Sequence, residues 1–347
     1  NKGWNDGAGN PPNPHGLKTD YLWKEYLTKR NLTDILENYA QVVEEVDERG
    51  KKKPPKQVFP RFHQLDVVRK LLADAEAQGA GKRYLIQHSA GSGKSNSIAW
   101  LAHQLISLET GRRMTFDSVI VVTDRRVLDS QLQATISQFE HKKGVVQAIS
   151  ENSAQLAKAL NDSTPVVVTT LQKFGFILQT VGDLGKKRFA LIIDEAHSSQ
   201  SGAAARKLRQ ALTKGKPKAV EVIEGETVEV EGDVQIDPED ITAEDVINDV
   251  IQSRQRPDNV SYFAFTATPK NKTLELFGRK GPEGLPIPFH VYSMRQAIEE
   301  GFILDVLKHY TSYAAFYQLS ALANDKLLPQ KKAKQALAQF AKLHAHN

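Results

Sequence analysis

The chain has 347 residues, 40% of them hydrophobic and 25% charged, which is the composition of an ordinary soluble globular protein. No run approaches the ~20 apolar residues that a membrane-spanning helix needs, so we expect no membrane association. The absence of cysteine excludes disulfides and thiol chemistry and fits a cytoplasmic location. The length allows two domains. Because the chain starts without methionine or a signal peptide, we expect it to be a piece of a longer protein.

The formal net charge of +5 is unevenly distributed along the chain. The segment from Glu221 to Asp249 holds twelve acidic residues and no lysine or arginine, so the rest of the chain is strongly basic. A basic body suits a polyanionic partner such as nucleic acid, although many soluble proteins are mildly basic. Within this acidic insertion, 221–249, the pattern predicts a hairpin over 227–236 and a helix from Ala243. The acidic composition favours an insertion that lies on the surface in solvent. The alternative is an acidic patch that docks another domain or imitates the charge of DNA.

The N-terminal part of the chain is predicted to be a helical connector. Residues 1–16 are rich in glycine, asparagine and proline and indicate irregular structure. The apolar spacing predicts two helices between Tyr21 and about Val46. A polar linker rich in lysine and proline is expected from Asp47 to Lys56.

From Phe59 onward, helical and strand patterns alternate. Short apolar runs predict buried strands at Tyr84–Gln87, Val119–Thr123, Val166–Thr170, Ala190–Ile193 and Tyr262–Thr266. Helix-like spacing occurs in three sets: Leu65, Val68, Leu71, Leu72 and Ala75; Ile98, Leu101, Leu105 and Leu108; Leu128, Leu132, Ile136 and Phe139. This alternation predicts a three-layer α/β fold with a mostly parallel sheet and helices on both faces. In such sheets ligands bind at the carboxyl ends of the strands.

The stretch QHSAGSGKSN, residues 87–96, lies between a predicted strand and a predicted helix. It ends like a phosphate-binding loop of the pattern G-x-x-x-x-G-K-[ST], but His88 stands where that pattern has its first glycine. Gly91 and Gly93 allow the backbone, including Ser92, to approach phosphates at the start of a helix. Lys94 can reach the β- and γ-phosphate oxygens and the Ser95 hydroxyl can bind Mg²⁺. A chance glycine-rich turn is the alternative interpretation.

The stretch LIIDEAH, residues 191–197, delivers two adjacent carboxylates at the end of a buried strand. Two neighbouring carboxylates repel each other unless a cation or proton donor is present. Beside the glycine-rich loop, the economical assignment places Asp194 in the Mg²⁺ shell and gives Glu195 the role of orienting the attacking water. We expect His197 to link this hydrolysis site to the rest of the protein.

Two further segments carry polar side chains next to predicted elements. Thr266 and Thr268 follow the last apolar strand, and their hydroxyls can hydrogen-bond His197 or Glu195. Gln64 stands at the start of a helix, and a glutamine amide can pair with the N6/N7 edge of adenine. Gln64 is therefore a candidate for selecting ATP, or else an ordinary polar residue at a helix start.

Together these motifs resemble those of superfamily 2 helicases. The set comprises HSAGSGKS, VVTDRRVLDSQL (121–132), VVTTLQKF (167–174), DEAHSSQSG (194–202) and FTATPKNKTLELFG (265–278). In detail the chain is similar to the ATP-driven motor of the R subunit of type I restriction enzymes. The stretches NKGWNDGAGNPPNP, YLWKEYL, PRFHQ and FHVYSMRQAIEEGFILDV (289–306) resemble that subunit too, so the likeness covers nearly the whole chain.

The resemblance implies a RecA-like P-loop NTPase domain that uses ATP and Mg²⁺. It implies that Gln64 reads adenine, that Lys94 and Ser95 bind phosphate and Mg²⁺, and that Asp194 and Glu195 form the acidic pair of hydrolysis. Thr266 and Thr268 would couple hydrolysis to motion. The motifs that border the DNA track contain Thr123, Arg125, Thr169, Thr170 and Lys173, each of which could instead be a strand-end packing or capping residue. The implied partners are double-stranded DNA and the methyltransferase and specificity subunits.

The resemblance also implies a domain organisation. Residues 1–58 would be the helical connector after a missing N-terminal nuclease domain, and 59–304 the first motor domain with the acidic insertion. Residues 305–347 would start a second RecA-like domain, which is expected to be truncated. We therefore expect an ATP-dependent DNA translocase whose isolated fragment has weak ATPase and no nuclease activity. A stand-alone superfamily 2 helicase or remodeller and a non-catalytic ATP-binding module are the alternatives.

Overall fold

The structure is a computed structural model that describes residues 13–43, 54–123, 126–139, 144–149, 153–170, 177, 180–181, 184–194 and 258–305. The chain divides into two compact units, residues 1–300 and residues 301–347. Several predictions lie outside the described residues: those on Arg125, Lys173, Glu195, His197, the acidic insertion 221–249 and residues 306–347. The predicted domain boundaries stay predictions.

A seven-stranded sheet forms the centre of the first unit, and every strand pair in it is parallel. Its order is β13 (His290–Tyr292), β3 (Arg83–His88), β10 (Val260–Thr266), β9 (Phe189–Ile193), β6 (Ser118–Thr123), β8 (Val166–Thr170) and β7 (Val146–Ala148). A parallel sheet is covered on both faces, which is why its central strands are continuous apolar runs. The five predicted strands are confirmed; β7 and β13 were not predicted.

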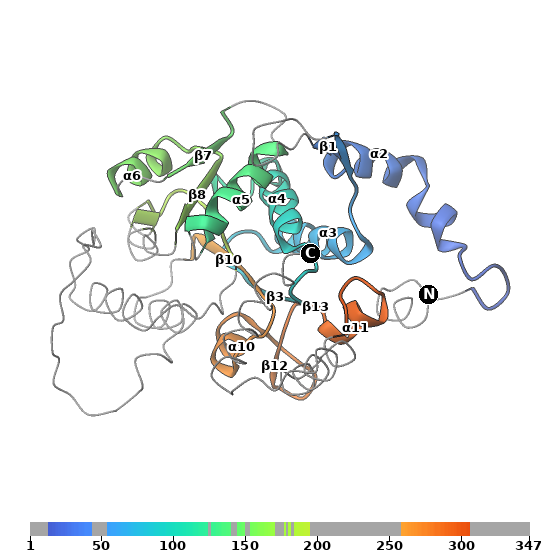
Figure 1. The fold of residues 1–347 in the computed structure, drawn as a ribbon. Coiled ribbons are helices and arrows are strands. Elements are labelled where there is room, and N and C mark those ends of the chain that lie inside the picture. Colours follow the sequence, from blue (N-terminus) through green and yellow to red (C-terminus); the bar gives the residue numbers. More distant parts are fainter. Residues whose placement is uncertain are drawn as a thin grey trace, which may run out of the picture. The chain divides into compact units, whose positions relative to one another are not determined.

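Helices cover both faces of this sheet and make the fold three-layered (Figure 1). On one face pack α3 (Phe62–Gln78), α4 (Lys94–Leu105) and α5 (Arg126–Gln138), and on the other α6 (Ser153–Asn161) and α10 (Asn271–Phe277). Successive residues of β6 alternate between these cores: Val119 and Val121 face the first, Ile120 and Val122 the second. The predicted three-layer α/β fold is therefore confirmed, as are the helical patterns, except that Leu108 and Phe139 lie just beyond their helices.

The N-terminal segment differs in part from the prediction of two helices up to about Val46. A single-turn π-helix, η1 (Leu22–Tyr26), and α2 (Lys29–Asn38) are helical. The chain then becomes a strand, β1 (Gln41–Val43), which pairs antiparallel with β2 (Lys56–Val58). The helical prediction is thus wrong at Val43, because β-branched valines beside a partner strand favour the extended chain. The predicted linker also ends earlier, since Lys56 already belongs to β2.

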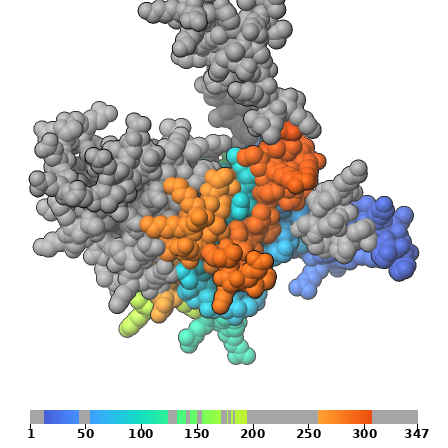
Figure 2. All heavy atoms as spheres, turned by 90° about the horizontal axis from the view of Figure 1, so that it is seen from below, coloured from blue at the N-terminus to red at the C-terminus, as the bar shows by residue number. Residues whose placement is uncertain are grey.

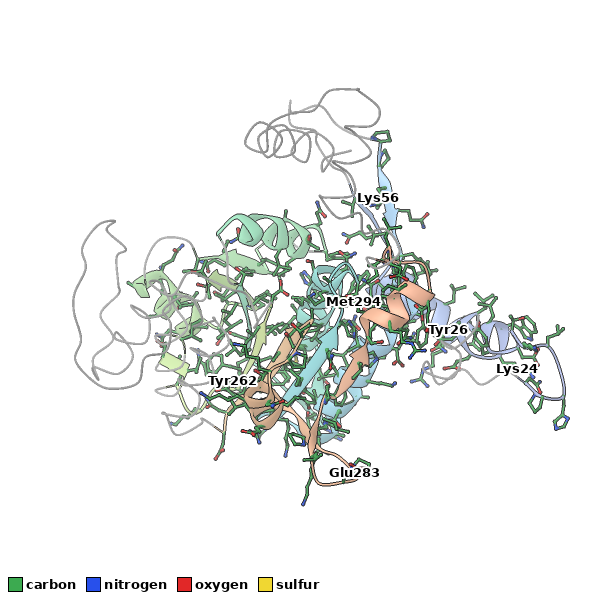
Figure 3. All side chains as sticks on the ribbon, turned by 60° about the horizontal axis from the view of Figure 1, so that its bottom comes forward. Lys24, Tyr26, Lys56, Tyr262, Glu283 and Met294 are labelled. Atoms are coloured by element: carbon green, nitrogen blue, oxygen red, sulfur yellow. The ribbon has the colours of Figure 1, made fainter. Side chains whose placement is uncertain are left out.

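The remaining elements are short. Two hairpins join β4 (Glu109–Thr110) to β5 (Arg113–Met114) and β11 (Arg279–Lys280) to β12 (Pro286–Ile287), and Glu283 lies in the second turn (Figure 3). Helix α11 (Met294–Glu299) follows β13 (Figure 3). Figure 2 shows part of residues 260–300, in orange and red, beside the cyan residues of the β3–α4 region. None of the helices in the described part of the chain is long and apolar enough to cross a membrane.

Candidate nucleotide-binding site

The glycine-rich loop joins the carboxyl end of β3 to the amino end of α4, as its sequence predicts. Gly91 and Gly93 have φ values of 74° and 80°, in the left-handed region that side chains other than glycine seldom adopt. At Gly93 there is also no room, because a Cβ would lie 2.5 Å from the amide nitrogen of Gln64. Both the backbone conformation and the close approach of Gln64 therefore require glycine at position 93.

The loop offers the donors that a phosphate group needs. Helix α4 has twelve residues and starts directly at Lys94, so its first N–H groups point at the loop. Lys94 is only 7% exposed, and its ammonium lies 3.5 Å from the Ser89 carbonyl oxygen. The hydroxyls of Ser89 and Ser92 are buried and have no hydrogen-bond partner among the described residues. Buried polar atoms are normally paired, so these residues fit an incoming anion.

The first turn of α3 holds this loop from one side. The Gln64 amide nitrogen donates to the Gly93 carbonyl at 2.9 Å, and its oxygen accepts from the Arg61 backbone N–H at 2.9 Å. The His63 Nε2–H donates to the Ser92 carbonyl at 2.8 Å. Both ends of the Gln64 amide thus already bind backbone, one at the loop and one at the helix start. Gln64 lies at the nucleotide loop as expected, and its adenine-reading role stays a prediction.

Two histidines at this site are held neutral. Burial lowers the pKa of His63 to about 4, which outweighs the opposing effect of its hydrogen bond to Ser92. Burial also lowers the pKa of His88 well below its usual value, and the nearby His290, His63 and Lys94 act in the same direction. Protonation of His88 would place a second cation in a buried site near Lys94.

His88, which replaces the first glycine of the loop pattern, has its own partners. It is fully buried, and its Nε2 lies 2.9 Å from Nδ1 of His290 on β13. The His290 Nε2 in turn lies 2.9 Å from the Asp66 carboxylate of α3, which also binds Lys70 at 2.7 Å. Burial alone would raise the pKa of Asp66, but these two hydrogen bonds outweigh it and hold that pKa below its usual value.

The other predicted residues that the structure describes lie at the same edge of the sheet. Thr123 pairs with Thr170, Thr169 is buried one position earlier, and the Asp194 N–H donates to Val122 at 2.9 Å. Strand β10 separates β3 from β9, so the ends of the loop strand and the Asp194 strand are about 10 Å apart. Thr266 ends the strand between them and is fully buried.

The remaining three predicted residues are not buried to the same extent. Ser95 is half-buried in the first turn of α4. Asp194 directly follows β9 and is half-buried, and its role as a Mg²⁺ ligand stays a prediction. Thr268 lies two residues beyond β10 and is exposed, so the structure does not draw it into the site with Thr266.

Sequence reasoning missed four residues that surround the loop: His63, Asp66, His290 and Tyr292. The His63 ring stacks on Tyr292, with centroids 3.7 Å apart and planes 8° from parallel. The Tyr292 hydroxyl donates to Glu300 at 2.7 Å, and its carbonyl accepts from the Ser89 N–H at 3.0 Å. The available signal was His88 itself, because an imidazole at the end of a buried strand needs polar partners.

The first prediction concerns Gly93. In Gly93→Ala we expect a loss of unfolding free energy beyond the about 1–2 kcal/mol that the left-handed conformation costs, because the new Cβ meets the Gln64 amide. Gly111→Ala is the matched control, since Gly111 has φ 69° and nothing lies near its Cβ position. Urea denaturation measures both. The additional loss in Gly93→Ala should vanish in the double variant that also carries Gln64→Ala. Equal losses of unfolding free energy in Gly93→Ala and Gly111→Ala would contradict the close approach of Gln64.

The second prediction concerns pH. The unfolded His63 takes up a proton near pH 6.5 and the folded one only near pH 4, so the stability it contributes is present above about pH 6.5 and is lost as the pH falls towards about pH 4. Between about pH 7.5 and about pH 5 this removes about 2 kcal/mol. His63→Phe keeps an aromatic ring against Tyr292 and cannot titrate. Over this pH range the unfolding free energy of His63→Phe, measured by denaturant titration, should fall by about 2 kcal/mol less than that of the unaltered chain. Parallel pH curves for the two proteins would refute this.

Comparison with known proteins places this site in a family context. Residues 63–218 match the SWI2/SNF2 ATPase family. A type I restriction enzyme endonuclease subunit of Staphylococcus aureus (strain COL) is 27% identical over 70% of this chain and 21% of that protein. The C-terminal part of a putative type I restriction enzyme endonuclease subunit of Mycoplasma pneumoniae is 36% identical over 36% of this chain and 61% of that protein. The chain therefore spans about a fifth of the length of the first of these relatives.

Among solved structures, a nuclease-deletion mutant of the type ISP restriction-modification enzyme LlaGI, in complex with a DNA substrate mimic, is 16% identical. The match has a TM-score of 0.39 and covers 72% of this chain and 21% of that chain. At that TM-score the likeness does not bear on function. The sequence relatives and the family match agree with the loop and strand-end geometry: this chain is a homologue of the endonuclease subunits of type I restriction enzymes and contains a match to the SWI2/SNF2 ATPase family.

Proposed function

We propose that this chain is an ATP-driven motor domain of a type I restriction endonuclease subunit, which moves double-stranded DNA before a separate nuclease domain cuts it. The observation that carries the proposal is the loop after β3, where buried Lys94 and the start of α4 face the same edge of the sheet as Asp194. The homology to endonuclease subunits and the SWI2/SNF2 match support it. Phosphoryl transfer requires mainly positioning and charge stabilisation, which a rigid sheet edge supplies.

The proposed roles follow from where each residue lies. Lys94 and the loop N–H groups bind the β- and γ-phosphates of ATP, and Ser95 and Asp194 hold Mg²⁺, which when bound neutralises charge on the phosphates. Glu195 orients a water that attacks the γ-phosphorus, so that ADP leaves with the β–γ bridging oxygen. Thr266, on the strand between loop and acidic pair, couples hydrolysis to motion together with Thr268 and His197.

DNA contact is proposed at the same edge of the sheet. Thr123, Thr169 and Thr170 end strands β6 and β8 there, and Arg125 and Lys173 follow these strands in sequence. A translocase must pass over any sequence, so phosphate contacts without base reading suit it. The proposed partners are duplex DNA and the methyltransferase and specificity subunits. The SWI2/SNF2 match alone also fits a stand-alone DNA translocase, which would need neither subunit.

The third prediction tests nucleotide binding. The purified chain should bind ATP or ADP with Mg²⁺ at least about tenfold more tightly than GTP, and Gln64→Ala should abolish that preference because it removes the proposed adenine reader. Lys94→Ala should abolish binding of either nucleotide. Isothermal titration calorimetry measures each affinity.

The matched control for Lys94→Ala is Lys82→Ala. Lys82 is exposed and precedes β3 at its amino end, whereas Lys94 follows the carboxyl end of the same strand. Binding unchanged in Lys94→Ala, or equally weakened in Lys82→Ala, would refute the site. Glu195→Gln should keep ATP binding and lose whatever phosphate release the unaltered chain shows. Equal affinity for GTP in the unaltered chain would refute the role of Gln64 alone.

The fourth prediction tests DNA binding. The chain should bind duplex DNA without sequence preference, with an affinity that falls steeply as salt rises, because each contacted phosphate releases counterions. Arg125→Ala and Lys173→Ala should each lower the affinity and reduce the salt slope by about 1. Fluorescence anisotropy at several salt concentrations measures this, with Lys82→Ala as the control. Sequence-selective or salt-insensitive binding contradicts a motor that tracks the backbone.

A further inference from the structure

A chain of hydrogen bonds runs from the surface of α3 to the start of the glycine-rich loop. It starts at Lys70 on α3, passes through Asp66 on the same helix and His290 on β13, and ends at His88, the first residue of the loop. Successive polar atoms are 2.7, 2.9 and 2.9 Å apart. The His290 side chain is 9% exposed and His88 is fully buried, so the bond between the two imidazoles is largely shielded from water, whereas the Lys70 side chain is 54% exposed.

Elementary donor and acceptor rules decide where the protons lie. A carboxylate only accepts, so the Nε2 of His290 carries a proton and donates it to Asp66. A neutral imidazole carries a single N–H, so with its Nε2–H bound to Asp66 the Nδ1 of His290 is a lone pair that accepts. The Nε2 of His88 must then carry the proton, which leaves Nδ1 of His88 as a bare lone pair.

The Nδ1 atom of His88 agrees with this assignment. It is buried and has no hydrogen-bond partner among the described residues. A buried nitrogen with an unpaired lone pair costs less free energy than the unpaired N–H of a charged imidazole. Burial and the nearby His290, His63 and Lys94 all lower the pKa of His88 and so disfavour a second proton on its ring. Among the described residues, the bond with His290 is the one hydrogen bond of this imidazole, whose ring also contacts His63, Phe265 and Tyr292.

A second set of contacts joins the same three elements. Tyr292, two residues after His290, accepts the Ser89 N–H on its carbonyl and stacks its ring on His63. His63 donates to Ser92 in the loop. Residues of α3 and β13 thus hold the loop at positions 88, 89 and 92. Strand β13 lies at an edge of the sheet, and α11 and Glu300 follow it at the end of the first compact unit.

We propose that His290 and Asp66 are positioning residues of the nucleotide site, which hold His88 as the Nε2–H tautomer in one orientation and so fix the start of the phosphate-binding loop. A glycine at position 88 has no side chain to orient, whereas an imidazole there needs a hydrogen bond that fixes its orientation if the loop is to keep one conformation. The expected effect on Mg·ATP binding rests on the proposed function, whereas the assignment of the proton on His88 does not.

The proton assignment is tested directly by nuclear magnetic resonance. In long-range ¹H–¹⁵N correlation spectra of the full chain labelled at histidine nitrogens, His88 should show a protonated Nε2 and an unprotonated Nδ1. The resonances are assigned with His88→Gly. His290→Phe should shift the His88 nitrogens and broaden them as the ring loses its anchor. A protonated Nδ1 in the unaltered chain, or His88 signals that do not respond to His290→Phe, would overturn the proposal.

The consequence for binding is tested by calorimetric titration with Mg·ATP. His290→Phe leaves the buried His88 N–H without an acceptor, so we expect about tenfold weaker binding. His290→Asn should retain more affinity, because its side-chain oxygen can take the place of Nδ1 as acceptor. Arg295→Ala is the control on α11, since Arg295 is exposed and, in the part of the chain that the structure describes, its side chain pairs with Glu299 one turn away. It should bind like the unaltered chain.

A double-mutant cycle decides whether His290 acts through His88. In a His88→Gly background, His290→Phe should have no further effect on affinity, since no imidazole remains to be held. The same loss in both backgrounds would overturn the proposal, as would no loss in His290→Phe alone. If His290→Phe fails to fold, Asp66→Asn replaces it, with a smaller loss that should also vanish in His88→Gly. Absence of Mg·ATP binding by the unaltered chain would refute the proposed function, while the spectra would still decide the tautomer of His88.

Discussion

The hydrogen bonds from the first turn of α3 to the carbonyls of Ser92 and Gly93 are the constraint on which the site depends. A glycine-rich loop has little conformational preference of its own, so something outside it must choose its shape. Gln64 and His63 do this by occupying carbonyl oxygens on one side of the loop, which leaves its N–H groups for an anion. The close fit of Gln64 against Gly93 shows how tightly the two segments are matched.

These hydrogen bonds can fix the shape of the loop only because the sheet that carries it is rigid. Seven parallel strands, packed on both faces by helices, bring segments that are distant in sequence to one edge. The loop after β3, Thr266 at the end of β10 and Asp194 after β9 lie at the ends of adjacent strands, although Asp194 lies a hundred residues after Lys94 in sequence. Because close-packed interiors deform little, polar groups at the strand ends keep their spacing.

The same arrangement carries a cost in stability. His63 and His88 are buried and must stay neutral, so folding excludes protons that the unfolded chain would bind. An apolar residue at either position would avoid this penalty but would leave the loop carbonyl of Ser92, or the acceptor nitrogen of His290, without its partner. The buried imidazoles are thus retained where they satisfy other polar groups.

Much of the fold could be predicted from sequence because it depends on local patterns. Buried strands such as Val166–Thr170 are continuous apolar runs, and the helix faces of α3 and α4 repeat with helical spacing, so element type and layer order follow directly. The glycine-rich loop and the position of Asp194 after β9 could be predicted for the same reason, since each motif is contiguous in the chain. Short elements were harder: β13 and β7 have three residues each, and Val43 adopts a strand only because β2 lies beside it.

The sequence by itself determined the fold class, the glycine-rich loop between β3 and α4 and the strand that ends at Asp194. Only the tertiary structure decided what His88 does in place of glycine, and that His63, Asp66, His290 and Tyr292 belong to the same site. Those residues come from three segments with no shared motif, and their hydrogen bonds exist only once α3, β3 and β13 are packed together. Periodicity reports which side chains are buried along one segment. It carries no information on which buried polar group in another segment will meet them, because pairing is set by strand order and register.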